Sequence, residues 1–85
     1  MPHPWYVYIV RCTDASLYTG IAMDVEARVL KHNLGTGAKY VRGRGPVKLV
    51  WVQRMKNGTE ARKREAEIKG WTKEKKECLL STYEH

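Results

Sequence analysis

Hydrophobic and polar positions along the chain predict three short strands and three helices. Runs rich in β-branched and aromatic residues predict strands at residues 5–10, 17–21 and 47–53. Helical spacing of apolar residues predicts helices at residues 25–34 and 60–69, and a last one from Thr72 towards the C-terminus. The order β-β-α-β-α-α predicts an α+β fold, a small three-stranded antiparallel sheet covered by helices, as one domain over residues 1–85.

The first predicted strand is apolar on both faces, which is typical of a central strand. Alternation places Tyr6, Tyr8 and Val10 on one face and Trp5, Val7 and Ile9 on the other. The second predicted strand contains Gly20. A glycine inside a strand indicates a bulge or a close approach of the backbone to a ligand.

The predicted helix at residues 25–34 has clear ends but two apolar stripes. Asp24 is a favourable N-cap, and Gly35 stands where helices commonly end. One stripe contains Val25, Val29 and His32 with Arg28 at its edge, and the other contains Ala27, Leu30 and Leu34. The pattern does not decide which stripe meets the sheet.

The predicted helix at residues 60–69, with Thr59 as its expected cap, carries a carboxylate on its apolar stripe. Ala61, Glu65 and Ile68 share that stripe, whereas Glu67 points towards solvent. A carboxylate on a buried stripe is costly unless it is paired, hydrogen-bonded or bound to a metal. Glu65 is therefore a candidate functional residue, and a salt bridge to Arg28 or a lysine is the structural alternative.

Composition points to a polyanionic partner. Sixteen Lys and Arg against nine Asp and Glu give a net charge of +7 and a pI near 9.7. Nucleic acid is the expected partner, and solubility alone is the simpler explanation. We expect no membrane partner, because no stretch combines a basic face with a large apolar one. Cys12 and Cys78 are expected to be reduced, partly buried thiols, and without a signal peptide or transmembrane run the expected location is cytoplasmic.

The segment from Gly35 to Pro46 is a glycine-rich loop that carries cations and an aromatic residue. The candidate nucleic-acid contacts in it are Lys39, Tyr40, Arg42 and Arg44. Solvation of these side chains is the alternative, and the glycine spacing is too sparse to indicate a phosphate-binding loop. The later lysines, Lys73, Lys75 and Lys76, are expected to form a solvated helix face.

Tyr8, Tyr18 and Arg28 follow one another at intervals of ten residues, and His32 lies one helical turn beyond Arg28. Taken singly, each residue has an ordinary explanation. The tyrosines could be core rings with satisfied hydroxyls, the arginine an exposed helix residue, and the histidine a cation near a helix C-terminus.

The ordered set resembles the GIY-YIG nuclease domain. The resemblance rests on Tyr6-Val7-Tyr8, Tyr18-Thr19-Gly20, Arg28 and the glutamate on a later helix, and it covers residues 5–80. Further stretches resemble the small stand-alone bacterial members: Trp5 to Ile9, His32-Asn33, Gly37-Ala38-Lys39-Tyr40 and Glu65 to Lys69.

The resemblance implies a metal-dependent endonuclease that hydrolyses phosphodiester bonds, with Mg²⁺ or Mn²⁺ held by Glu65 as the sole protein ligand. Arg28 would neutralise the phosphate, and His32 would position the water or transfer a proton. Tyr8 is the favoured general base with Tyr18 as its partner, and the reverse assignment stays open. A tyrosine can act as base only if its pKa of about 10 is lowered.

The chain also departs from the family pattern. Tyr6 replaces the glycine of the first triplet, and Thr19 replaces the isoleucine of the second. Ile21 stands where the DNA-repair members have a lysine beside the second tyrosine, and no asparagine follows Glu65. The missing lysine removes an electrostatic helper for Tyr18 and puts catalytic efficiency in question.

Two main functional hypotheses follow. The first is an endonuclease of low sequence selectivity that acts on nucleic acid, with DNA favoured over RNA, in a role such as DNA repair and with a possible partner protein supplying specificity. The second is a non-catalytic nucleic-acid-binding module that retains the fold. An interaction domain without nucleic acid is a third and weaker hypothesis.

Overall fold

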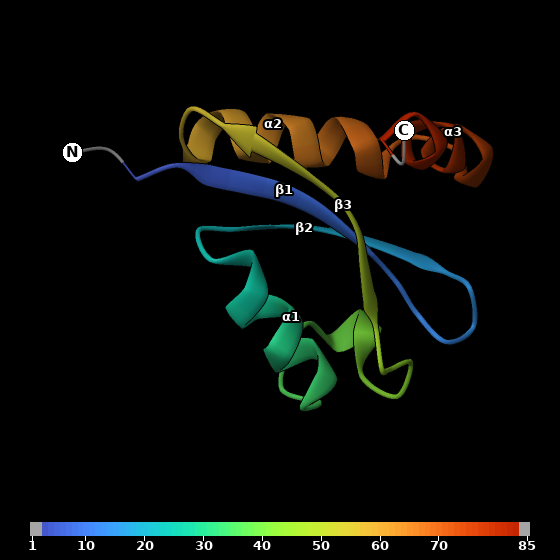
Figure 1. The fold of residues 1–85 in the computed structure, drawn as a ribbon. Coiled ribbons are helices and arrows are strands. Elements are labelled where there is room, and N and C mark those ends of the chain that lie inside the picture. Colours follow the sequence, from blue (N-terminus) through green and yellow to red (C-terminus); the bar gives the residue numbers. More distant parts are fainter. Residues whose placement is uncertain (1–2, 84–85) are drawn as a thin grey trace.

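The computed structural model describes residues 3–83 and contains a small sheet with helices on both sides (Figure 1). The strands are β1 (Trp5–Arg11), β2 (Leu17–Ala22) and β3 (Lys48–Met55). The helices are α1 (Val25–Asn33), α2 (Gly58–Lys69) and α3 (Lys73–Tyr83), and a short 3₁₀ helix, η1, spans Lys39–Val41. The predicted α+β class and the order β-β-α-β-α-α are confirmed.

The sheet is antiparallel, with strand order β2-β1-β3, so β1 is central as its apolar faces predict. The register between β1 and β2 places Tyr8 directly opposite Gly20. The pairing of β1 with β3 shifts register between Ile9 and Val10. Both β2 and β3 are edge strands among the residues that the structure describes, and the candidate site lies along the β2 edge.

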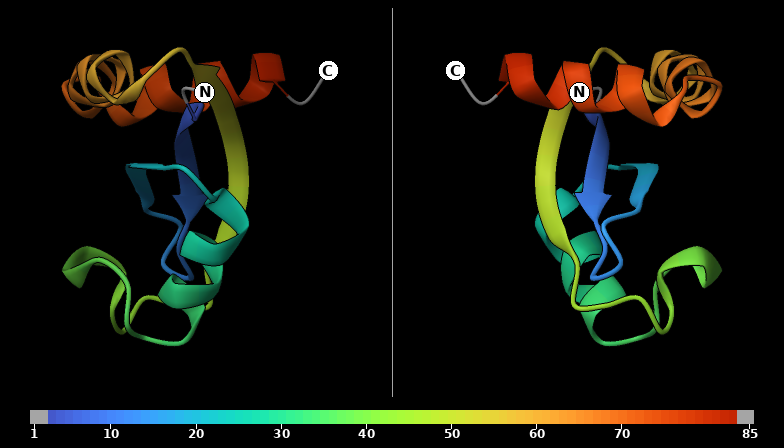
Figure 2. Two further views of the ribbon diagram at one scale, coloured as in Figure 1. Left: turned by 90° about the vertical axis from the view of Figure 1, so that its left-hand side faces the viewer. Right: turned by 90° about the vertical axis from the view of Figure 1, so that its right-hand side faces the viewer.

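Each face of the sheet covers its own hydrophobic cluster, because successive side chains of β1 point to opposite faces. On the α1 side the buried cluster comprises Tyr8, Val10, Cys12, Ala22, Val25, Val41 and Val47. On the side of α2 and α3 it comprises Val7, Ile9, Trp51, Ala61, Ile68 and Leu80. Figure 2 shows α2 and α3 above the sheet and α1 with the loop below it. The predicted division of the first strand between two faces is confirmed.

Helix α1 turns its first stripe towards the sheet. Val25 and His32 are buried, whereas Leu30 is 59% and Leu34 is 68% exposed. Asp24 caps the helix as predicted by accepting a hydrogen bond from the Ala27 N–H at 3.0 Å. Gly35 follows with φ +79°, the left-handed conformation that glycine adopts without steric cost. This orientation brings Arg28 and His32 towards the tyrosines of the sheet.

The predicted cap of α2 is wrong by two residues. Asn57 is the N-cap, and its side-chain oxygen accepts the Glu60 N–H at 2.9 Å. Asparagine caps helices better than threonine, so the helix begins at Gly58 and includes Thr59. The stripe is confirmed, since Ala61 and Ile68 are fully buried while Glu67 is exposed. Thr72 opens α3 as predicted, with its hydroxyl accepting the Lys75 N–H.

The loop after α1 is anchored at both ends. The Asn33 side chain accepts the Val47 N–H at 2.6 Å and donates to the Val47 carbonyl at 3.4 Å. Between these points η1 buries Val41 in the core. Of the two free cysteines, Cys12 is buried, but Cys78 is exposed and not partly buried as expected. Within residues 3–83, no helix has the length and apolar character needed to cross a membrane.

We expect Ile68→Ala to destabilise the fold by about 2–5 kcal/mol, because it leaves a cavity between α2 and the sheet. The matched control is Leu30→Ala, which removes a mostly exposed side chain from α1 and should change the free energy of unfolding by no more than about 0.5 kcal/mol. Urea unfolding monitored by tryptophan fluorescence measures both. Equal effects of the two substitutions would contradict the packing described above.

Candidate active site

The candidate site lies at the β2 edge of the sheet, between α2 and the loop that contains η1 (Figure 2). The Tyr18 ring on β2 is its centre. The Tyr40 ring of η1 stacks on it with centroids 5.8 Å apart, and Lys69 Nζ of α2 lies 5.6 Å from its centroid. The His32 ring meets it edge-on at 5.5 Å. Four separate elements therefore supply side chains to one place.

Tyr8 lies across the backbone of the neighbouring strand. Its ring is fully buried, and a Cβ added at Gly20 would lie 2.6 Å from the Tyr8 hydroxyl oxygen. No side chain can occupy that space while the ring stays in place, so the glycine inside β2 is explained by close packing and not by a bulge. The sequence suggested a bulge or a ligand at this glycine, but the group that approaches it closely is a tyrosine of the same chain.

His32 is buried and joins Tyr8 to the loop. The Tyr8 hydroxyl and His32 Nε2 are 2.9 Å apart, and Nδ1 accepts the Ala38 N–H at 3.3 Å. Burial first, and then the charge of Arg28, lowers the pKa of His32, which favours the neutral ring. With Nδ1 occupied as an acceptor, the hydrogen-bond pattern assigns the ring proton to Nε2. His32 therefore donates to the Tyr8 oxygen.

Gly37 has no side chain, and this leaves space for the imidazole ring of His32. A Cβ added at Gly37 would lie 2.1 Å from His32 Nδ1, a separation that atoms do not tolerate. The residue following it, Ala38, supplies the N–H that fixes the ring. The loop between α1 and β3 thus has a second role besides any contact with a ligand, because its backbone orients the partner of Tyr8.

The electrostatics of Tyr8 show which charges surround it. Burial, followed by the nearby Tyr18, raises the pKa of Tyr8 to about 12, and the charge of Glu65 adds to the rise. The Arg28 guanidinium opposes it through its charge and its polar contact with the hydroxyl. The five residues predicted from the sequence, namely Tyr8, Tyr18, Arg28, His32 and Glu65, are therefore brought together.

Glu65 does not pair with Arg28. Its carboxylate lies 3.4 Å from Lys69 Nζ one turn further along α2, and its side chain is 22% exposed. Lys69 also faces the Tyr18 ring, so it supplies from α2 the cation that Ile21 does not supply from β2. The ion pair with Lys69 agrees with the lysine alternative expected for Glu65, whereas the contact of Lys69 with Tyr18 was not predicted. The spacing of four residues between Glu65 and Lys69 is the signal that would have placed both on the same helix face.

The four loop residues predicted to bind nucleic acid have different surroundings. Tyr40 is 44% exposed and contacts both Tyr18 and the Arg44 guanidinium, which lies 4.6 Å from its centroid. Arg44 is also paired with Asp14 at 2.7 Å, so its charge is used within the fold. Lys39 and Arg42 are exposed. Within residues 3–83, Lys39 and Arg42 form no ion pair, whereas Arg44, the third loop cation, does.

The residues present suit a magnesium-like ion. Over residues 3–83 there is no group of three His, Cys, Asp or Glu side chains able to hold a metal, and Glu65 is the one carboxylate among the predicted catalytic residues. Its carboxylate is a hard oxygen donor that is partly open to solvent. One carboxylate completed by waters and phosphate oxygens is a common arrangement for Mg²⁺. The donor set does not suit zinc, which requires three or four protein ligands.

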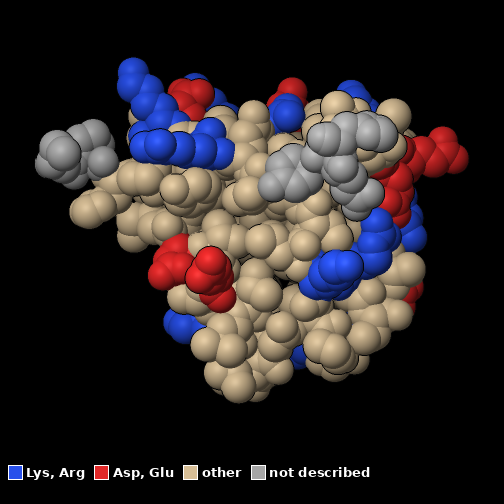
Figure 3. Space-filling model, in the orientation of Figure 1, with Lys and Arg blue, Asp and Glu red and all other residues tan. Residues whose placement is uncertain are grey.

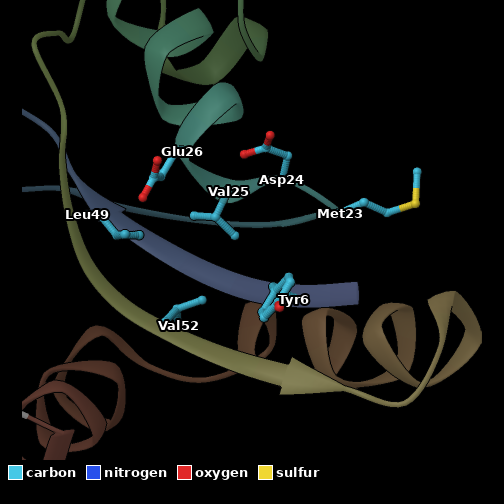
Figure 4. Close-up of a pocket in the computed structure, with 7 residues that line it drawn as sticks. All are labelled: Tyr6, Met23, Asp24, Val25, Glu26, Leu49 and Val52. Carbon is cyan, nitrogen blue, oxygen red and sulfur yellow. The ribbon is translucent and has the colours of Figure 1, made fainter. Parts of the chain in front are cut away.

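A separate hollow lies away from this site. It measures about 400 Å³ and is lined by Tyr6, Met23, Asp24, Val25, Glu26, Leu49 and Val52 (Figure 4). Its two charged residues are acidic, so it does not suit a phosphate. Figure 3 shows the same character on this face, with red atoms beside the start of α1 and blue atoms mainly around the margin. None of the predicted site residues lines this hollow.

The comparisons with known proteins agree with the geometry. The family model of the GIY-YIG catalytic domain matches residues 4–77. A UPF0213 protein of Staphylococcus saprophyticus is 53% identical over 76 residues, covering 89% of this chain and 93% of the relative. A UPF0213 protein of Staphylococcus aureus is 58% identical over 75 residues, with coverage of 88% and 92%.

Two solved structures are similar as well. The solution NMR structure of a UPF0213 protein from Bacillus halodurans is 47% identical, with a TM-score of 0.61, covering 93% of this chain and 84% of that one. The solution NMR structure of a protein from E. faecalis is 37% identical, with a TM-score of 0.64 and coverage of 95% and 86%. The expected likeness to small bacterial members of the family is therefore confirmed.

We expect the stability of the protein to fall between pH 10 and pH 12 because of Tyr8. Its pKa is about 12 when folded and about 10 when unfolded, so the folded state holds the proton more tightly. The stabilising contribution is complete below pH 10 and is lost as the pH rises through the folded pKa. Measured by urea unfolding at pH 9 to 11.5, wild type should lose about 2 kcal/mol relative to Tyr8→Phe. Parallel pH profiles for the two proteins would contradict this.

Proposed function

Because the chain belongs to the GIY-YIG catalytic domain family, a family of nucleases, we propose that it is a metal-dependent endonuclease. Its substrate would be nucleic acid, DNA in preference to RNA. The observation that carries the proposal is that Arg28 of α1 makes a polar contact with the Tyr8 hydroxyl, while Glu65 of α2 lies near enough for its charge to affect the Tyr8 pKa. A cation, a carboxylate and a titratable oxygen are what hydrolysis of a phosphodiester requires.

Arg28 binds the scissile phosphate in this proposal. It is exposed on α1, so its planar guanidinium can reach an incoming oxygen anion and donate two hydrogen bonds. Its charge also favours the ionised form of Tyr8.

Tyr8 is the proposed general base. Its oxygen accepts a hydrogen bond from His32 Nε2, and that donor would also stabilise the phenolate. A pKa of about 12 keeps the phenol protonated at neutral pH, so its activation requires additional positive charge near the oxygen. No part of Tyr8 is exposed, so substrate binding must also open a path for the attacking water.

Glu65 is the proposed ligand of Mg²⁺ or Mn²⁺. When bound, the ion would supply positive charge to the phosphate and lower the pKa of nearby acids. Glu65 keeps its carboxylate partly exposed, and Lys69 balances its charge in the free protein. Lys69 also lies over the Tyr18 ring, so release from Glu65 would leave a cation at the place where the substrate enters.

We propose low sequence selectivity for this activity. The residues around the site contact phosphates and ring faces, and such contacts carry little base information. Selectivity would then come from the structure of the DNA, such as a damaged or single-stranded region, or from a partner protein. A role in DNA repair in the cytoplasm is consistent with this proposal.

A second candidate function is nucleic-acid binding without cleavage. The burial of Tyr8 and the pairing of Glu65 with Lys69 favour it, since both keep the proposed machinery inactive in the free protein. The basic composition would serve either function. The two candidates differ in one measurable property, which is metal-dependent strand breakage.

We expect Glu65→Gln to reduce metal-dependent nicking of supercoiled plasmid by at least about 100-fold, because it removes the charge that would hold the ion. The fold should persist, since the lost ion pair with Lys69 is a helix-surface pair of about 0.5 kcal/mol. Agarose gels with Mg²⁺ or Mn²⁺ measure the loss of the supercoiled form.

The matched control is Glu67→Gln, which removes the same charge from the same helix but lies off the stripe and pairs with Arg64. It should nick at nearly the wild-type rate. If wild type and Glu65→Gln behave alike, the enzyme proposal is wrong and the binding module is the remaining candidate.

We expect the two tyrosines to differ when only their hydroxyls are removed. Tyr8→Phe should reduce nicking by at least about 100-fold, because it removes the proposed base. Tyr18→Phe should have a smaller effect, because the ring keeps its contacts with Tyr40 and Lys69. Single-turnover rates on labelled DNA compare the two. A severe loss in Tyr18→Phe with a mild one in Tyr8→Phe would reverse the roles.

A further inference from the structure

A second hollow opens beside the candidate site, at the hairpin end of β2. It measures about 250 Å³ and is lined by Asp14, Ser16, Leu17, Tyr40, Lys73 and Lys76. The lysines come from the first turn of α3, whereas the other residues come from the hairpin and from η1. None of the proposed catalytic residues lines it.

The charge of this hollow is positive. Within residues 3–83, neither Lys73 nor Lys76 forms an ion pair with a carboxylate. The one acidic group, Asp14, accepts hydrogen bonds from Ser16 and pairs with Arg44, which together lower its pKa to about 2. Its negative charge is thus balanced by Arg44. The charge of Lys73 also acts on Glu77, but that carboxylate is paired with Arg11 at 2.7 Å, so the two lysines keep the hollow positive.

The hollow adjoins the candidate site through one shared residue. Tyr40 lines the hollow and also stacks on Tyr18. Ser16 lies two residues before Tyr18, a distance of roughly 7 Å along an extended chain. Successive phosphates of a B-form strand rise about 3.4 Å each along the helix axis, so this distance is within one or two nucleotide steps. A strand with its scissile phosphate beside Tyr18 would therefore bring a neighbouring phosphate to the hollow.

We propose that this hollow binds a backbone phosphate of the nucleic-acid strand, flanking the bond that is cut. The proposal rests on the function proposed above and extends it to a second contact. Lys73 and Lys76 supply the charge, and the Ser16 hydroxyl and the Tyr40 ring border the bound group. The contact is to the backbone, so it adds affinity and sets the position of the strand without reading its sequence.

Three neighbouring lysines of α3 are expected from the sequence to form one solvated helix face, but the structure gives them different surroundings. Lys75 lies over the Trp71 ring, with its Nζ 4.4 Å from the centroid, and does not line the hollow. Lys75 is therefore the natural control, because it carries the same charge on the same turn of helix. A diffuse electrostatic attraction would depend on all three lysines equally.

The test compares Lys73→Gln/Lys76→Gln with Lys63→Gln/Lys75→Gln, a control that loses the same two charges outside the hollow. The readout is the fluorescence anisotropy of a labelled 20-nucleotide DNA, single-stranded and as a duplex, in EDTA so that no cleavage occurs. Affinities are measured between 50 and 200 mM salt. At 50 mM, Lys73→Gln/Lys76→Gln should bind about 10-fold more weakly than wild type. The slope of log affinity against log salt concentration should be smaller by about 1 to 2. The control should keep a slope close to that of wild type.

A second measurement locates the contact. Single methylphosphonate linkages, which remove one backbone charge, are placed in turn along the labelled strand. At one or two positions wild type should lose affinity while Lys73→Gln/Lys76→Gln should not, because the contact is already gone. Thermal unfolding by circular dichroism checks that both double variants are folded.

Equal salt slopes in the two double variants, with wild type still binding and nicking DNA, would overturn the phosphate subsite and leave the proposed function standing. Absence of both salt-dependent binding and nicking in wild type would overturn the proposed function, and the subsite with it. The subsite is supported if affinity and salt slope fall only in Lys73→Gln/Lys76→Gln, and if a methylphosphonate at one position weakens wild type but not that variant.

Discussion

The hydrogen bond between Tyr8 and His32 is the interaction on which the arrangement of the site depends. It joins the central strand β1 to helix α1, and the Ala38 N–H extends it to the loop beyond that helix. Two glycines make it possible, since Gly20 leaves space for the tyrosine ring and Gly37 leaves space for the imidazole. Strands β1 and β2, helix α1 and the loop after α1 are thereby packed into one unit, in which each polar group has a defined partner.

The same unit explains how a thin core accommodates polar groups. Tyr8 and His32 are both buried, and burial pushes each towards its neutral form, raising one pKa and lowering the other. The charged residues Arg28, Glu65 and Lys69 stand at the margin, where water still reaches them. Because the buried groups are neutral and the charged groups lie at the edge, the fold avoids the free-energy cost of burying an ion. The charges are still close enough to affect the pKa of Tyr8.

Local sequence signals were sufficient for most of the fold, whereas the main site residues were named from the ordered set that resembles the GIY-YIG domain. Alternation along β1, the Asp24 cap and the stripe of α2 each depend on a few neighbouring residues, so they could be predicted. The orientation of α1 could not, because its two stripes are similar and only packing against the sheet distinguishes them. The contact of Lys69 with Tyr18 was missed for a related reason. It depends on how α2 lies against the β2 edge, which no local pattern records.

The division of the positive charges follows from the same packing. Arg44 is predicted from its position in the loop to contact a ligand, but the fold uses it to neutralise Asp14 and to cover the Tyr40 ring. That use makes the hairpin end of β2 less negative, which is what allows Lys73 and Lys76 to present a net positive hollow there. A cation paired within the protein can thus contribute to recognition indirectly, by cancelling a carboxylate that would otherwise repel the same phosphate.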